Sequence, residues 1–367
     1  MVLASHRVAA RVHGGTVTPR LVRFHLTPAL GVKLDKISRL REELALALDA
    51  PRCRVVRHGG QIDVELPREA GRRVRLDEVL RGVQDIPPWT VVLGLDEEGA
   101  PLLVRLASAE VAHALIAGTT GSGKTALART MIASLALTNR LADLSLVLID
   151  PKGRGYGVFA GLPHLMGPVV TEVDEAVAVL DGLVGEMERR DRLAPAQVPR
   201  LVVFIDELAD LLMTGGAAAA RAVTRLAQRG RGAGIHLVAC TQKPSASVTG
   251  TLLKATFPLR LVGSVPSADD AKVAAGVPGT GAESLMGRGD FLLVAKGQQI
   301  RFQAAFIAEQ DIAHIVRCLG AGLAMPPRQL PEPQAASETE ALQPPLLIEH
   351  DEDNVVSFEA KRKRVRR

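Results

Sequence analysis

A glycine-rich segment in the first half of the chain carries the clearest chemistry. It reads GTTGSGKT and fits the P-loop pattern G-x-x-x-x-G-K-[ST] in full. Glycines in such a loop let backbone N–H groups turn inward and hold phosphate oxygens at the start of a helix. An apolar stretch at 114–117 precedes the loop, and a helical pattern at 123–137 overlaps its end. The segment therefore predicts an ATP site formed by Gly118, Thr119, Thr120, Gly121, Ser122, Gly123, Lys124 and Thr125.

The end of the loop and a later pair of acids predict how the triphosphate is handled. We expect Lys124 to reach the β- and γ-phosphates and the Thr125 hydroxyl to ligate Mg²⁺. The apolar run LVVFIDE ends in Asp206, which can support the metal, and Glu207, which can orient and deprotonate the attacking water. This pair favours ATP hydrolysis over nucleotide binding alone. Asp150 also ends an apolar run and competes for the metal role, but no second acid follows it.

Polar residues at another strand end and on a helix could complete the site. The run HLVACTQ ends in Thr241 and Gln242, and a polar residue at the tip of such a strand can sense the γ-phosphate. Upstream, VTRLAQRGRGAG carries Arg225, Arg229 and Arg231. One of these arginines could reach the γ-phosphate of a neighbouring subunit as an arginine finger. Their spacing alone fits a solvated helix face as well, so both interpretations stay open.

The elements that must position these residues indicate an α/β domain with a mostly parallel sheet. From about residue 91, short apolar runs alternate with helical stretches. Near-continuous apolar strands between helices are typical of a buried parallel sheet. We expect the strands at 114–117, 146–150, 201–206, 236–240, 258–262 and 290–295.

A smaller α+β domain is expected before the sheet. Apolar and polar residues alternate over 16–26, which predicts a strand, and 34–50 has helical spacing. RCRVVRH and QIDVELP predict two more strands, and IPPWT at 86–90 predicts a linker. The predicted organisation is a flexible N-terminus at 1–13, a small α+β domain at 14–85, a P-loop ATPase domain at 86–326 and a disordered acidic linker with a basic tail at 327–367.

Composition and charge narrow the class of protein. With 47% hydrophobic and 23% charged residues, the 367-residue chain has the composition of a soluble globular protein. No run approaches the roughly 18 apolar residues of a membrane span, and three scattered cysteines suit the cytoplasm. The net charge of +5 is uneven, because an acidic stretch at 331–360 precedes the terminal KRKRVRR. That end could tether DNA electrostatically, or it could be a solubilising end.

Ordered strings over about residues 14 to 318 resemble one known family. Taken together, they are similar to the cytosolic motor of the FtsK/SpoIIIE DNA translocases. The strings are LTPALGVKLDKISRL, HALIAGTTGSGKT, LIDPK, GLPHL, GEMERR, VVFIDELADLL, RLAQRGRGAGIHL, CTQKPS and GAESLMGRGD.

The resemblance implies a RecA-like P-loop ATPase that forms a homo-hexameric ring, uses ATP and Mg²⁺, and pulls double-stranded DNA through its channel. The N-terminal piece corresponds to the family's α domain, and 91–318 corresponds to its β domain. Phosphate contacts in the channel would follow DNA without reading its sequence. The implied catalytic residues are Lys124, Asp206, Glu207, Arg231 acting in trans, and Gln242. The implied DNA contacts are Thr241, Lys243, Lys254 and Lys272.

Departures from the family pattern leave the biological setting open. We expect neither the family's membrane domain nor its C-terminal winged helix, and a usually basic channel position is Ala268. An anchoring partner at the membrane or division site is not identified by the sequence. The leading hypothesis is a DNA translocase for chromosome segregation or cell division. Alternatives are a conjugative or mobile-element transfer motor, a non-translocating DNA-binding ATPase and a secretion ATPase.

Overall fold

The chain folds into two compact units, Met1–Arg73 and Val74–Arg367. The division falls before the predicted boundary at 85–86, because Val74, Leu76 and Leu80 pack in the core of the second unit. The structure is a computed structural model, and it describes residues 2–17, 21–58, 61–68, 72–108, 111–192, 198–242, 256–323 and 346–348.

The first unit is a four-stranded antiparallel sheet with short helices. Its strand order is β1-β2-β4-β3. The predicted strand at 16–26 is in fact the end of β1 and most of β2, and the predicted helix at 34–50 is split into α2 and α3. The first thirteen residues, expected to be flexible, include α1 and the start of β1. The elements are α1 (Val2–Ser5), β1 (Ala10–Val17), β2 (Leu21–Pro28), α2 (Leu34–Ser38), α3 (Arg41–Ala47), β3 (Arg54–His58) and β4 (Gln61–Pro67).

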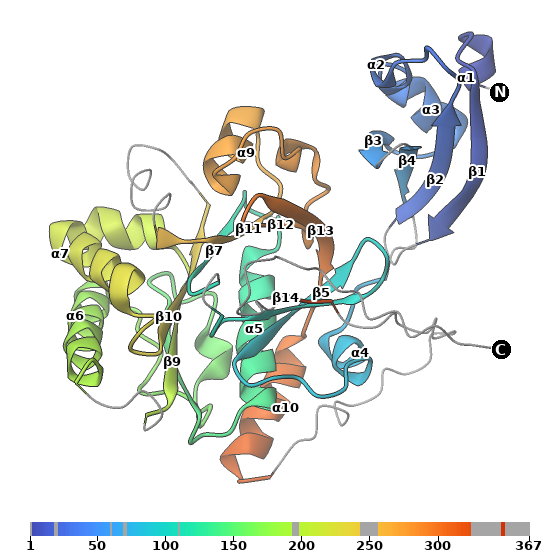
Figure 1. The fold of residues 1–367 in the computed structure, drawn as a ribbon. Helices are drawn as coiled ribbons and strands as arrows, with labels where there is room; N and C mark the ends of the chain where they lie inside the picture. Colours follow the sequence, from blue (N-terminus) through green and yellow to red (C-terminus); the bar gives the residue numbers. More distant parts are fainter. Residues whose placement is uncertain are drawn as a thin grey trace. The chain divides into compact units, whose positions relative to one another are not determined.

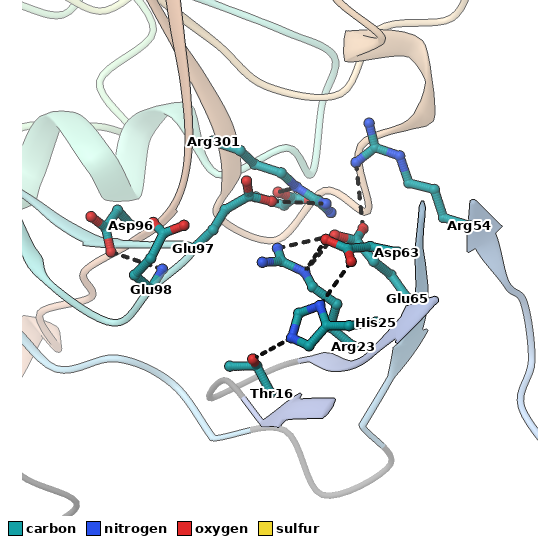
Figure 2. Close-up of polar contacts among 11 residues, drawn as sticks. Thr16, Arg23, His25, Arg54, Asp63, Glu65, Asp96, Glu97, Glu98 and Arg301 are labelled. Carbon is teal, nitrogen blue, oxygen red and sulfur yellow. Dashed lines mark hydrogen bonds and ion pairs between the residues drawn. The ribbon is translucent and has the colours of Figure 1, made fainter. Parts of the chain in front are cut away.

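Alternation along β2 and β4 separates the two faces of this small sheet. Leu26 and Val64 lie in the apolar cluster that also holds Ile37 of α2. Neighbouring positions carry a polar network instead, shown in Figure 2. Within it, Arg23 Nη2 lies 3.1 Å from Glu65 Oε1. Asp63 Oδ1 lies 2.8 Å from His25 Nδ1. One face of the sheet therefore packs on the helices, and the other is lined by charged groups.

The second unit is built on one large mixed sheet with the strand order β14-β6-β5-β13-β12-β11-β7-β10-β9-β8. Its strands are β5 (Thr90–Asp96), β6 (Pro101–Arg105), β7 (Ala114–Ala117), β8 (Leu144–Ile149), β9 (Arg200–Ile205), β10 (Ile235–Thr241), β11 (Leu259–Val262), β12 (Asp290–Ala295), β13 (Gln298–Ala304) and β14 (Leu346–Ile348). Its helices are α4 (Leu76–Arg81), α5 (Lys124–Thr138), η1 (Gly157–Phe159), α6 (Val173–Arg190), α7 (Leu208–Arg229), α9 (Ala268–Ala275), η3 (Ala282–Ser284) and α10 (Glu309–Gly320).

The sheet changes character at β11. Strands β8, β9, β10, β7 and β11 pair in parallel, as the apolar runs predict. Beyond β11 the strands β12, β13, β5 and β6 pair antiparallel, so the mostly parallel sheet is extended by an antiparallel part. The predicted linker at 86–90 belongs to this extension: Thr90 begins β5, and Trp89 N donates to Asn139 Oδ1 at 2.8 Å.

Helices cover both faces of the sheet (Figure 1). Residues of α4, α5 and α10 share one apolar cluster with the sheet, and residues of α6, α7 and α9 share the other. Among the residues described, no helix combines the length and apolar character of a membrane crossing. The parallel strands end at a common edge, which brings Ala117, Ile149, Ile205, Thr241 and Val262 to one side of the unit. The residues that follow these strand ends form the candidate site.

Candidate active site

The P-loop joins the buried strand β7 to helix α5. Gly118, Gly121 and Gly123 all have positive φ, of 152°, 82° and 106°. A Cβ on Gly123 would lie 2.9 Å from the backbone nitrogen of Gly289, so the loop has no space for a side chain there. The glycines thus permit a tight turn that delivers backbone N–H groups to the start of a fifteen-residue helix, the arrangement that binds phosphate.

Lys124 lies folded onto the loop that precedes it. Its Nζ donates to the carbonyl oxygens of Gly118 and Thr119, at 2.8 and 2.9 Å. Burial lowers the pKa of the ammonium, and the neighbouring Glu207 and Asp206 act in the opposite direction. The Lys124 ammonium is therefore held at the loop, close to Asp206 and Glu207.

Asp206 meets the first turn of α5 at the end of β9. Thr125 Oγ1 donates to Asp206 Oδ1 at 3.3 Å, and the backbone nitrogen of Asp206 donates to Ile149 O at 3.0 Å. Burial raises the pKa of Asp206, the Asp150 carboxylate raises it further, and the bond from Thr125 opposes both. A hydroxyl and a carboxylate oxygen thus face each other beside the P-loop.

Glu207 is buried next to this pair and is connected to the loop through Gln242. Its two carboxylate oxygens accept from the backbone nitrogen of Gln242, at 3.2 and 3.1 Å. Gln242 Oε1 in turn accepts from Thr120 Oγ1 at 2.9 Å. Burial raises the pKa of Glu207, which suits a group that must take up a proton. The chain Thr120–Gln242–Glu207 therefore links the phosphate-binding loop to the candidate base.

Asp150, the other acid that the sequence offers for the metal, binds the chain that follows β8 through one of its carboxylate oxygens. It is fully buried, and its Oδ2 accepts from the backbone nitrogens of Gly155 and Tyr156, at 2.8 and 2.9 Å. The carboxylate therefore organises the turn that follows β8.

Two segments that sequence reasoning missed also pack on the P-loop. The backbone nitrogens of Arg288 and Gly289 donate to the carbonyls of Gly121 and Ser122, at 3.0 and 2.8 Å. The backbone nitrogen of Thr119 donates to the carbonyl oxygen of Ser264, just after β11, at 2.8 Å. The GRGD string in the family resemblance was the available signal for the first segment; the second contact has no local signal.

A buried ion pair holds the chain directly after Arg288 and Gly289. Arg301 donates through Nε and Nη2 to the two oxygens of Asp290, each at 2.9 Å. Its Nη1 lies 3.6 Å from Glu97 Oε1, and Figure 2 shows Arg301 reaching toward that acid. The antiparallel part of the sheet thus supports the P-loop from the side.

The three arginines proposed as finger candidates lie apart from this site. Arg225 is paired with Glu188, and Arg229 Nη2 lies 2.6 Å from Asp191 Oδ2. Arg231 is exposed in the turn before β10. Since β10 ends at Thr241, the seven-residue strand separates Arg231 from the P-loop edge by about 20 Å.

The predicted DNA contacts fare differently. Thr241 is fully buried at the end of β10, so its side chain has no surface for DNA, and this prediction is wrong for the structure. Lys272 is exposed on α9, which follows β11 at the nucleotide edge. Lys243 and Lys254 lie outside the described residues.

The donor set fits a small hard cation. Among the described residues there is no cluster of three or more histidines, cysteines and acids that could enclose a metal. Thr125 and Asp206 instead place two oxygen atoms that could ligate a cation beside a phosphate-binding loop. Mg²⁺ is commonly bound by one or two protein oxygens together with substrate phosphates and water.

Strand, loop, helix and paired acids define the class: the protein is a P-loop ATPase with a RecA-like sheet. The FtsK/SpoIIIE family matches residues 83–197 and 193–246, and the FtsK alpha domain matches residues 1–68. The chain therefore belongs to the FtsK/SpoIIIE family.

Curated relatives extend the similarity over most of the chain. It is 34% identical to a DNA translocase FtsK of Sporosarcina ureae, over 85% of this chain and 44% of the relative. It is 36% identical to a DNA translocase FtsK of Staphylococcus aureus, over 84% and 43%, and 34% identical to the DNA translocase SftA of Bacillus subtilis, over 86% and 36%. The chain thus spans less than half the length of these relatives.

Solved structures show the same fold. The pCW3 conjugation coupling protein TcpA with ATPγS superposes with a TM-score of 0.61 at 18% identity, covering 87% of this chain and 97% of that one. The cytoplasmic domain of the Thermomonospora curvata type VII secretion ATPase EccC gives 0.59 at 26% identity, covering 72% and 36%.

Proposed function

We propose that this chain is an ATP-driven motor that moves along double-stranded DNA, serving chromosome segregation or cell division in the cytoplasm. One observation carries the proposal: a P-loop, Lys124 and the acids Asp206 and Glu207 are assembled within a chain whose two units both match FtsK family descriptions. Relatives named DNA translocases support DNA as the partner. An anchor at the membrane or division site would be a separate partner.

Each site residue has a distinct task in ATP hydrolysis. The P-loop amides and Lys124 bind the β- and γ-phosphates, and Thr125 and Asp206 hold Mg²⁺. The metal, when bound, neutralises charge on the phosphates. Glu207 orients the attacking water and accepts its proton, and Gln242 couples that acid to the loop.

The position of Arg231 supports a ring of identical subunits, which we propose to be a hexamer. An exposed arginine about 20 Å from its own P-loop edge does not contact its own nucleotide, whereas it is accessible to a neighbour. Head-to-tail association that closes into a ring brings such a residue to the next subunit's site.

DNA contact is proposed at Lys272, which is exposed on α9, and at Lys243 and Lys254. Ammonium groups bind phosphates without reading bases, so affinity should fall with salt. A conjugative transfer motor and a non-translocating DNA-binding ATPase remain the alternatives; the likeness to TcpA shows the shared fold.

The direct test is the rate of ATP hydrolysis with and without long duplex DNA. We expect DNA to raise turnover strongly in the wild type. Glu207→Gln should bind ATP and DNA without turnover. Wild-type turnover that is unchanged by DNA would contradict the proposal.

A further inference from the structure

The turn after β8 lies directly against the two proposed metal ligands. A Cβ on Gly155 would come 3.0 Å from Asp206 Oδ1 and 3.3 Å from Thr125 Cγ2. Both distances are tighter than ordinary van der Waals contact. Gly155 is not among the residues with positive φ, so its backbone conformation does not require glycine. A side chain at this position would therefore press on Asp206 and Thr125.

Two side chains from different elements hold Gly155 in place. The buried Asp150 carboxylate accepts from the backbone nitrogen of Gly155 at 2.8 Å. Arg129 donates through Nε to Gly155 O at 2.6 Å and through Nη2 to Arg154 O at 3.1 Å. The turn is thus bound through both its N–H and its C=O groups.

The arginine connects this turn to the P-loop helix. Arg129 follows Thr125 by four residues in α5, so the two side chains lie on the same face of the helix. The Arg129 side chain is 16% exposed, and its third contact is from Nη1 to Glu309 Oε1 at 2.7 Å. Helix α5 therefore carries both the proposed metal ligand Thr125 and the arginine that holds the turn beside it, Arg129.

We propose that Asp150 and Arg129 are positioning residues that hold Gly155 against Asp206 and so fix the Thr125–Asp206 pair for the cation. The inference rests on the proposed function of this site as a Mg²⁺–ATP site. Neither side chain needs to touch nucleotide or metal, because both act through the turn. Groups that orient metal ligands typically change metal affinity by about 10- to 100-fold when they are lost.

The first test uses Gly155→Ala with Gly157→Ala as the matched control. A Cβ on Gly157 meets nothing within 4 Å, and Gly157 also lacks a positive φ. Affinity for a fluorescent ATP analogue is measured with Mg²⁺ and with EDTA. The gain in affinity from Mg²⁺ should fall about tenfold or more in Gly155→Ala, with EDTA binding unchanged, and stay at wild-type size in Gly157→Ala. A wild-type gain in folded Gly155→Ala would overturn the proposal.

A second pair keeps the test valid if Gly155→Ala does not fold. Arg129→Lys removes the guanidinium that donates to the carbonyl oxygens of Gly155 and Arg154. Glu309→Gln removes only the ion pair and leaves these two hydrogen bonds in place. The lysine variant should lose Mg²⁺-dependent affinity, and the glutamine variant should not. Equal effects in both variants, or none in Arg129→Lys, would overturn the positioning role. Because the readout is binding, it is separate from the DNA-stimulated turnover that tests the proposed function.

Discussion

Replacing Arg231 with alanine distinguishes an arginine that acts on its own subunit from one that acts on the next. Coulomb's law gives about 0.2 kcal/mol for two unit charges about 20 Å apart in water, which is less than a twofold change in rate. A finger acting in trans is worth roughly 10³ to 10⁵ in rate in related phosphoryl-transfer enzymes. We therefore expect Arg231→Ala to bind nucleotide normally and to hydrolyse it at least about 10³-fold more slowly.

The assay that isolates the trans action mixes Arg231→Ala with Lys124→Ala subunits. Each variant alone should be inactive, but a subunit with an intact P-loop beside one with an intact Arg231 restores a complete site. Random mixing completes about a quarter of the interfaces in a ring, so a clear recovery of turnover is expected.

The absence of recovery, in rings shown to contain both subunits, would refute this reasoning. The role would then move to Arg229, which is paired with Asp191 at the surface. Arg260, the next arginine after Arg231 in the chain, would be a poor replacement, because it is buried and donates to Ala274 O at 3.0 Å.

Four further outcomes follow from the site and its surroundings. Lys124→Ala should reduce ATP turnover by orders of magnitude with the thermal unfolding temperature unchanged, because charge-assisted bonds to phosphate are lost; near-normal turnover in a folded variant would contradict its role. Glu207→Gln should retain ATP binding in a filter assay and stay trapped on DNA, since an amide cannot accept the water's proton. Burial lowers the pKa of His113 to about 3 and that of His236 to about 4, both below the unfolded value of about 6.5. The stability that these neutral histidines contribute is therefore complete above about pH 6.5 and is lost as the pH falls toward these lowered pKa values. The free energy of unfolding, measured with denaturant, should depend less steeply on pH in His236→Gln. Deleting 361–367, KRKRVRR, should flatten the salt dependence of DNA binding and leave turnover at saturating DNA nearly unchanged.

The parallel half of the sheet was predictable because its strands are buried on both faces. Runs such as ALIA and LVVFI are continuously apolar, and the structure has strands at each of those places. The antiparallel strands β5, β6 and β13 were missed, and for β5 the reason is that Trp89 and the prolines before it resemble a linker. Only tertiary contacts, such as Trp89 to Asn139, show that this segment is part of the core.

The P-loop and the acid pair could be recognised from local sequence patterns. The residues that pack against them come from distant parts of the chain and could not. Gly155 looks like any loop glycine in the sequence, and its value lies in its closeness to Asp206, fifty-one residues further along the chain. The hydrogen bond from Gly289 to Ser122 joins residues that lie still further apart in the chain. The family resemblance also implied Thr241 as a DNA contact, whereas the register of β10 between β7 and β9 buries its side chain.

The central claim is that ATP hydrolysis by this chain drives movement along duplex DNA. The most direct measurement is displacement of a third strand bound at one end of a long duplex, followed over time after ATP addition. The account predicts ATP-dependent displacement by the wild type, with a lag that grows with duplex length, and none by Lys124→Ala. DNA-stimulated ATP hydrolysis without any displacement would contradict the claim and identify a DNA-binding ATPase that does not translocate.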